Sequence, residues 1–121
     1  MKVAGFGFRK GAELESLVQA LDAAGGAKGV SRIATVAGKA ETPVFRALAR
    51  HLDLPLEAVE KDALPWVAVE TQSEKSVRMY GTGSLSEAVS LIAAGPKARL
   101  VAARAVSGDS MATCAIAEAA E

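Results

Sequence analysis

The strongest constraint on the fold is the alternation of short apolar segments with segments of helical period. Four apolar residues recur at the spacing i, i+3, i+4 and i+7, namely Leu14, Leu17, Val18 and Leu21. They predict one buried face of a helix over residues 12–24, between apolar runs at 2–8 and 31–37 that predict strands. A strand, a helix and a second strand in this order are typical of a parallel sheet, because parallel strands need a crossover connection.

The same alternation continues through the middle of the chain. Thr42 predicts the N-cap of a helix over residues 43–52, which begins with a proline whose missing N–H costs nothing there. We expect a short helical turn over 55–62, closed by Pro65, and a third strand over 66–69.

Two further helices are predicted before the last strands. The segment 73–80 fits a helix or a strand through Val77, and we favour the helix because Gly81 would then follow it as a left-handed C-terminal residue. Ser84 and Glu87 fit a capping box at the start of the next helix.

The C-terminal part predicts a hairpin, with strands over 100–106 and 111–117 joined by a turn at 107–110. Together, these elements predict an α/β fold: one domain over residues 1–121, with three α/β/α layers and a mostly parallel, mixed sheet. The 26 alanines and only five aromatic residues suit close packing of helices on a sheet.

Composition excludes several classes of function. The 14 basic residues balance 14 acidic ones, so the chain lacks the basic field expected of a nucleic-acid or membrane-surface binder. No apolar run reaches the length of a membrane span, and residues 1–8 do not resemble a signal peptide.

A single cysteine, Cys114, favours a reducing cytoplasm and a buried structural thiol. With His51 as the only histidine and expected on the surface, neither a metal site nor a Ser-His-Asp triad is predicted, and nothing indicates a cofactor.

The loop after the first predicted strand is the first candidate site. Gly5, Gly7 and Gly11 allow the backbone to approach a ligand, and Arg9 and Lys10 would add two cations at a helix N-terminus. The spacing does not match a dinucleotide fingerprint, because the third glycine comes one residue late. A plain strand–helix turn with two solvated cations is the alternative.

Two later loops complete the candidate ligand site. Lys39 and Glu41 follow the second strand, where they would either contact a ligand or remain solvated. The third loop joins two glycines and two hydroxyl groups before a helix, in the order Gly81, Thr82, Gly83 and Ser84. Its backbone N–H groups would suit a carboxylate or phosphate, although no lysine follows as in a P-loop.

Four segments in this order resemble the CobE/CbiG C-terminal domain family of cobalamin (vitamin B12) biosynthesis. They are GFGFRKG at 5–11, IATVAGK at 33–39, LDLPL at 52–56 and GTGSLSEA at 81–88, and the apolar close ATCAIA at 112–117 is also similar. The match spans nearly the whole chain, and its length suggests the stand-alone CobE form. Phe8 stands where the family often has cysteine, so no thiol chemistry is expected in the first loop. Arg104 stands near the position of a common family lysine.

The resemblance implies handling of a precorrin-type tetrapyrrole, a macrocycle edged with carboxylates. The favoured hypothesis is a carrier, stabiliser or helper of other corrin-pathway enzymes, with Arg9, Lys10 and Lys39 pairing with ligand carboxylates. The alternative is a hydrolase that opens a precorrin δ-lactone, with Glu41 as general base. Glu87 is the weaker candidate, since the predicted capping box already uses it. A third alternative is an anion-binding regulatory module.

Overall fold

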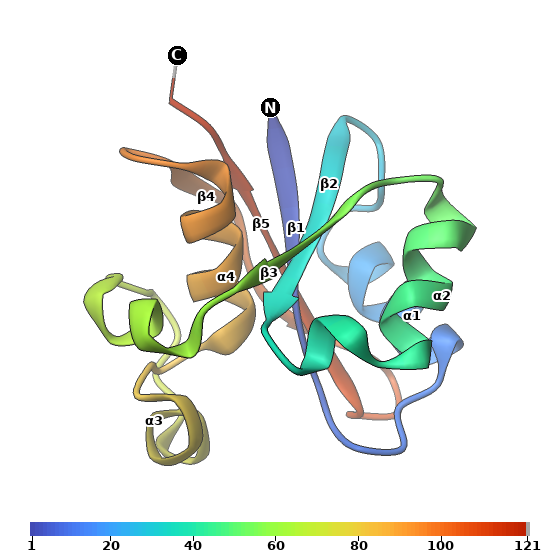
Figure 1. Ribbon diagram of the computed structural model, residues 1–121, viewed down its shortest axis with the longest axis horizontal. Coiled ribbons are helices and arrows are strands. Elements are labelled where there is room, and N and C mark those ends of the chain that lie inside the picture. The colour runs from blue at the N-terminus through green and yellow to red at the C-terminus, as the bar shows by residue number, and fades with distance from the viewer. Residues whose placement is uncertain (121) are drawn as a thin grey trace.

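The computed structural model describes residues 1–120. Its elements (Figure 1) are β1 (Lys2–Phe8), α1 (Leu14–Ala23), β2 (Val30–Val36), the 3₁₀ helix η1 (Lys39–Glu41), α2 (Pro43–Leu52), β3 (Leu56–Val59), the 3₁₀ helix η2 (Lys61–Trp66), α3 (Glu74–Tyr80), α4 (Leu85–Ala94), β4 (Arg99–Val106) and β5 (Ala112–Glu118).

The strands form one mixed sheet in the order β3-β2-β1-β5-β4. β1 pairs in parallel with β2, and β2 pairs in parallel with β3, whereas β5 runs antiparallel to both β1 and β4. Four strands therefore point the same way, and the carboxyl ends of β1, β2, β3 and β4 lie at one edge. The predicted mixed, mostly parallel sheet is confirmed.

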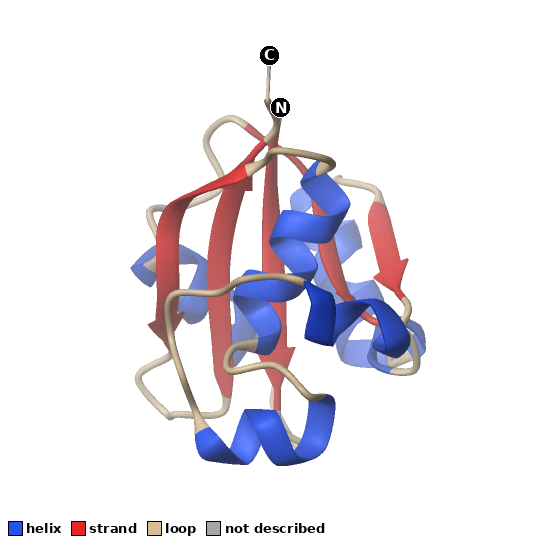
Figure 2. Cartoon of the chain, turned by 90° about the vertical axis from the view of Figure 1, so that its left-hand side faces the viewer, coloured by secondary structure: helices blue, strands red, loops and turns tan. Residues whose placement is uncertain are grey.

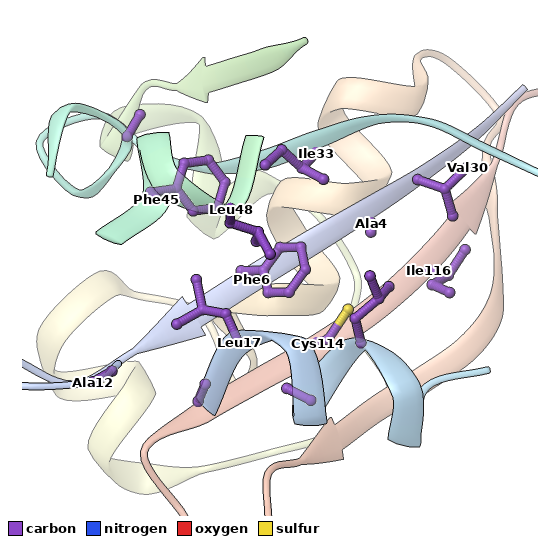
Figure 3. Packing of buried hydrophobic residues seen from close by; sticks show 14 residues of the cluster. Ala4, Phe6, Ala12, Leu17, Val30, Ile33, Phe45, Leu48, Cys114 and Ile116 are labelled. Atoms are coloured by element: carbon purple, nitrogen blue, oxygen red, sulfur yellow. The ribbon is translucent and has the colours of Figure 1, made fainter. Parts of the chain in front are cut away.

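Helices cover both faces of the sheet and make three layers. Figure 2 views the sheet from the side of α4, with α1 and α2 behind it. Side chains of β1 alternate between the layers, as the strand period requires. Phe6 packs with Leu17, Phe45 and Leu48 beneath α1 and α2 (Figure 3), whereas Val3 belongs to the cluster beneath α4.

Glycine in β1 allows α4 to lie directly against the strand. A Cβ atom added at Gly5 would clash with the backbone oxygen of Ser86 and would come within 2.7 Å of the Ser90 backbone nitrogen. The alanines that the composition suggested for close packing lie in both core clusters, on the two faces of the sheet.

Two predictions around residue 60 are wrong. Residues 56–59 form β3 and not a helical turn, because they pair with β2 in the register Ile33 to Leu56 through Val36 to Val59. The strand expected over 66–69 is absent: Pro65 lies within η2, and the Trp66 side chain is 87% exposed. β3 is a short edge strand that buries only Val59, so it lacks the pattern of a buried strand.

The remaining elements follow the predictions within a few residues. Pro43 is the first residue of α2, Gly81 ends α3 at φ 73°, and β4 and β5 form the C-terminal hairpin. Thr42 stands at the N-cap position, but its hydroxyl donates to the Lys39 carbonyl oxygen and caps no helical N–H.

Candidate functional site

A cleft of about 680 Å³ lies at the carboxyl ends of β1 and β2. Its lining comes from the loop after β1, from Lys39, from α3, from the start of α4, and from the ends of β4 and β5 near their turn. These residues are Gly7, Phe8, Arg9, Lys10, Lys39, Ser73, Lys75, Ser76, Met79, Tyr80, Gly83, Ser84, Leu85, Arg104, Val106, Ser110, Met111, Ala112 and Thr113.

The charged side chains of this lining are all positive. It contains five cationic side chains and no carboxylate, although the whole chain is electrically balanced. Within residues 1–120 the ion pairs are Arg32 with Glu57 at 2.8 Å and Arg99 with Glu118 at 3.3 Å, and neither pair involves a cleft cation. The cleft therefore concentrates positive charge that the protein itself does not neutralise.

Arg9, Lys10 and Lys39 form one side of the cleft, here named the β1–β2 rim. Lys39 Nζ donates a 2.6 Å hydrogen bond to the Phe8 carbonyl oxygen and lies 4.8 Å from the centroid of the Phe8 ring. The Phe8 ring stacks on Phe45, whose ring centroid is 5.9 Å away. Partial burial lowers the pKa of Lys39. This rim is built on the aromatic part of the core.

Lys75 from α3 and Arg104 from β4 also line the cleft, and they are here named the α3–β4 rim. Ser73 caps α3 by accepting a hydrogen bond from the Ser76 N–H, and the Ser73 N–H donates to the Gly83 carbonyl oxygen at 2.8 Å. The second bond closes the base of the segment 73–83. No residue of α3 is fully buried, and the helix packs on the core beneath α4 through the partly buried Tyr80.

Glu87 is a fully buried carboxylate behind the α3–β4 rim. Burial alone would raise the pKa of Glu87, but hydrogen bonds from Thr71, Arg104 and Glu70 outweigh that effect and lower it. The capping box is therefore only half formed: Ser84 Oγ accepts from the Glu87 N–H, while the Glu87 carboxylate turns away to other donors. The prediction that capping occupies this carboxylate is wrong.

The sequence matches the family model described as "Cobalamin synthesis G C-terminus" over residues 2–117. The chain belongs to this family. It is thus a protein of the cobalamin biosynthesis pathway, of the CobE/CbiG C-terminal type. A search of curated proteins gave no significant match.

Solved structures agree with the family assignment. The crystal structure of CobE, a protein from the cobalamin biosynthetic pathway, is 26% identical, with a TM-score of 0.82 over 97% of this chain and 89% of that chain. The cobalamin biosynthesis protein chiG from Agrobacterium tumefaciens is 38% identical, with a TM-score of 0.75 and complete coverage of both chains. A cobalamin biosynthesis protein G homologue from Sulfolobus solfataricus shares the fold at 15% identity and a TM-score of 0.70, over 96% of this chain and 36% of that chain.

The structure brings together a subset of the residues predicted for ligand binding in this family member. Those lining the cleft are Gly7, Arg9, Lys10, Lys39, Gly83 and Ser84. Gly83 also has a structural reason to be glycine, because a Cβ atom there would clash with the Thr71 backbone oxygen and the Gln72 side chain.

Other predicted residues lie outside the lining and have structural roles. Gly5 is buried beneath α4, and Gly11 is a turn residue with φ 92°. Gly81 ends α3 close to Pro65, and Thr82 is buried, with its Oγ1 accepting from the Ser84 N–H at 3.4 Å.

The predicted general base, Glu41, is exposed at the end of η1 and does not line the cleft. Cys114 is buried, and desolvation raises the pKa of its thiol far above the usual range, as expected of a structural thiol. His51 is exposed. Among residues 1–120, no group of three potential ligands could hold a metal ion, and no helix has the length and apolar character needed to cross a membrane.

Lys75 and Arg104 are the cationic cleft residues that were not predicted as ligand contacts. A signal existed for Arg104: β4 runs parallel to β1, so an exposed cation near its end lies at the edge where β1 ends. No comparable signal existed for Lys75, because the short helix α3 has no apolar stripe from which its position on the fold could be predicted.

Proposed function

We propose that this protein binds a precorrin-type tetrapyrrole polycarboxylate in the cleft and serves the cobalamin pathway as a carrier or helper of its enzymes. The observation that carries this proposal is the lining of five cations without a carboxylate, at the edge of the sheet where β1 and β2 end. Ligands of open α/β sheets bind at this edge, and membership in the family supplies the pathway.

The chemistry of the lining suits a macrocycle edged with acetate and propionate groups. Guanidinium groups bind carboxylates through paired hydrogen bonds, and each of the two rims contributes one, Arg9 and Arg104. Apolar side chains also line the cleft, including Phe8, Met79 and Leu85, which would contact the ring itself.

The proposal is for binding and assigns no lactone hydrolysis. Glu41 is exposed and outside the lining, and Glu87 is buried and saturated with hydrogen-bond donors. Within residues 1–120 the cleft lining thus presents no carboxylate that could activate water.

An absorbance titration with a purified corrinoid polycarboxylate tests the proposal. We expect a saturable shift of the visible band with the wild-type protein, and about tenfold weaker binding for the variant Arg9→Ala/Lys10→Ala, as expected for two exposed ion pairs. The matched control is Lys28→Ala/Lys97→Ala, which removes the same charge from exposed positions just before β2 and β4, where these strands begin.

The heptamethyl ester of the same corrinoid separates charge recognition from general affinity for the ring. It should bind far more weakly than the polycarboxylate. Absence of any saturable shift with the polycarboxylate, or equal binding of the ester, would overturn the proposal.

A further inference from the structure

We infer that Glu87 is a positioning residue, which holds Lys75 and Arg104 in place to form the ligand-binding α3–β4 rim. This inference rests on the proposed function for its ligand, but its geometric basis can be measured without a ligand. Glu87 itself is fully buried and is not part of the cleft lining, so it acts only through other residues.

The Glu87 carboxylate accepts hydrogen bonds from two separate segments of the chain. Oε1 accepts from the backbone N–H groups of Glu70 at 2.8 Å and Thr71 at 3.0 Å. Oε2 accepts from the Thr71 hydroxyl at 2.7 Å and from the Arg104 N–H at 2.9 Å. One side chain of α4 therefore ties β4 to the segment that leads into α3.

The Arg104 N–H depends on this carboxylate. Regular pairing of β4 with β5 is interrupted between Ala102 and Ala105, which leaves Arg104 inside an irregular stretch of an edge strand. Such irregularities re-aim side chains, and here Glu87 satisfies the backbone group that the interruption frees. The direction of the Arg104 side chain toward the cleft is thereby fixed.

The position of Lys75 depends on the same carboxylate through a short chain of bonds. Thr71 lies two residues before Ser73, whose N–H bonds to the Gly83 carbonyl oxygen and closes the base of α3. α3 buries no residue, and its only described packing on the core is by the partly buried Tyr80 at its C-terminal end, so these polar bonds hold the N-terminal end that carries Lys75.

One substitution separates the hydrogen-bonding role of the Glu87 carboxylate from the space that its side chain fills. Glu87→Gln keeps the shape, but an amide has one acceptor oxygen and one donor nitrogen. The amide can take two orientations. In one, the glutamine oxygen accepts from the N–H groups of Glu70 and Thr71, and the NH₂ group then faces the Arg104 N–H. In the other, the oxygen accepts from the Arg104 N–H, and the NH₂ group faces the two backbone N–H groups of residues 70 and 71. Either way at least one of these N–H groups loses its acceptor.

A double-mutant cycle on corrinoid binding tests the inference. We expect Glu87→Gln to weaken binding about tenfold, as the loss of a charge-assisted hydrogen bond predicts. Arg104→Ala should then cost less in the Glu87→Gln background than in the wild type, whereas Arg9→Ala should cost the same in both. Full additivity of Glu87→Gln with Arg104→Ala would overturn the inference, because a merely destabilising change does not distinguish the rims.

Amide hydrogen exchange without ligand gives the second readout. In Glu87→Gln, exchange at residues 70–83 and 104 should accelerate about tenfold through local opening, while exchange in β1 and β2 should accelerate only as far as global stability falls. Thr71→Val removes one donor with little change of shape and should produce a smaller effect in the same segment, should Glu87→Gln fold poorly. Unchanged exchange in residues 70–83 in both variants would contradict the inference.

Ser90→Ala is the matched control, because Ser90 is also a buried polar residue of α4 and its hydroxyl bonds only within the helix, to the Glu87 carbonyl oxygen. It should lower stability and leave the exchange pattern of 70–83 and the binding cycle unchanged. If the wild-type protein binds no corrinoid, the proposed function fails, and the exchange measurement still decides whether Glu87 positions this rim.

Discussion

The two rims of the cleft carry charge of the same sign but are built in different ways. The β1–β2 rim lies directly on the aromatic core, with Lys39 over Phe8 and Phe8 stacked on Phe45. In the α3–β4 rim, α3 buries no residue and packs on the core through the partly buried Tyr80, and the Glu87 carboxylate ties β4 to the segment before α3. Changes beneath the first rim should therefore unfold the protein, whereas changes beneath the second should loosen one wall of the site.

The largest expected effect is that of Phe45→Ala. Phe45 is fully buried between the rings of Phe6 and Phe8, so its removal should lower the free energy of unfolding by about 3–5 kcal/mol. Urea denaturation followed by circular dichroism measures this loss. A loss below about 1 kcal/mol, the range of an ordinary surface change, would show that the β1–β2 rim does not depend on the aromatic core.

Acid should weaken the α3–β4 rim through Glu87. Because hydrogen bonds lower the pKa of Glu87 in the folded state, its stabilisation is complete above the unfolded pKa of about 4.3 and is lost as the pH falls through the folded value. We expect Glu87→Gln to cost on the order of 1–3 kcal/mol at neutral pH and much less in acid. Urea denaturation at about pH 7 and about pH 3 gives the comparison.

Asp109 provides the internal reference for this experiment. The hydroxyls of Ser107 and Ser16 lower its pKa as well, so some loss of stability in acid should remain in the Glu87 variant. A difference between wild type and Glu87→Gln that does not shrink in acid would contradict the assigned role of the carboxylate.

Lys39→Met should have a moderate effect on the β1–β2 rim. It keeps an apolar stem over the Phe8 ring and removes the hydrogen bond to the Phe8 carbonyl oxygen, at a cost of about 1 kcal/mol. Thermal unfolding measures the change, with the exposed Lys10→Met as control. Equal melting temperatures for the two variants would mean that Lys39 is no more tightly held than a solvated lysine.

The smallest effect on stability is expected on α3. Val77 and Met79 are 47% and 49% exposed, so alanine at either position should change the free energy of unfolding by less than about 0.5 kcal/mol. Met79 lines the cleft and Val77 does not. Corrinoid affinity should therefore fall for Met79→Ala alone, and an equal fall in both variants would argue against direct contact.

Prediction from the sequence succeeded where apolar periodicity is strong and failed where polar contacts decide the structure. Leu14, Leu17 and Leu21 define α1 without further information, and Arg9, Lys10 and Lys39 follow from knowing where strands end. β3 was missed because a four-residue edge strand buries only Val59.

The site was harder to predict on its α3–β4 side. Glu87 has the spacing of a capping box, and only the packing of α4 against residues 70–71 and β4 shows that its carboxylate bonds elsewhere. Lys75 reaches the cleft through a helix that no apolar stripe fixes. Long-range polar contacts of this kind leave no periodic signal in one sequence.

The most direct test is a map of backbone amide chemical shifts during titration with the corrinoid polycarboxylate. We expect residues 8–11, Lys39, the segment 73–83 and Arg104 to shift together along one saturation curve, because one ligand contacts both rims. Shifts confined to a single rim, or located away from the carboxyl ends of β1 and β2, would contradict it.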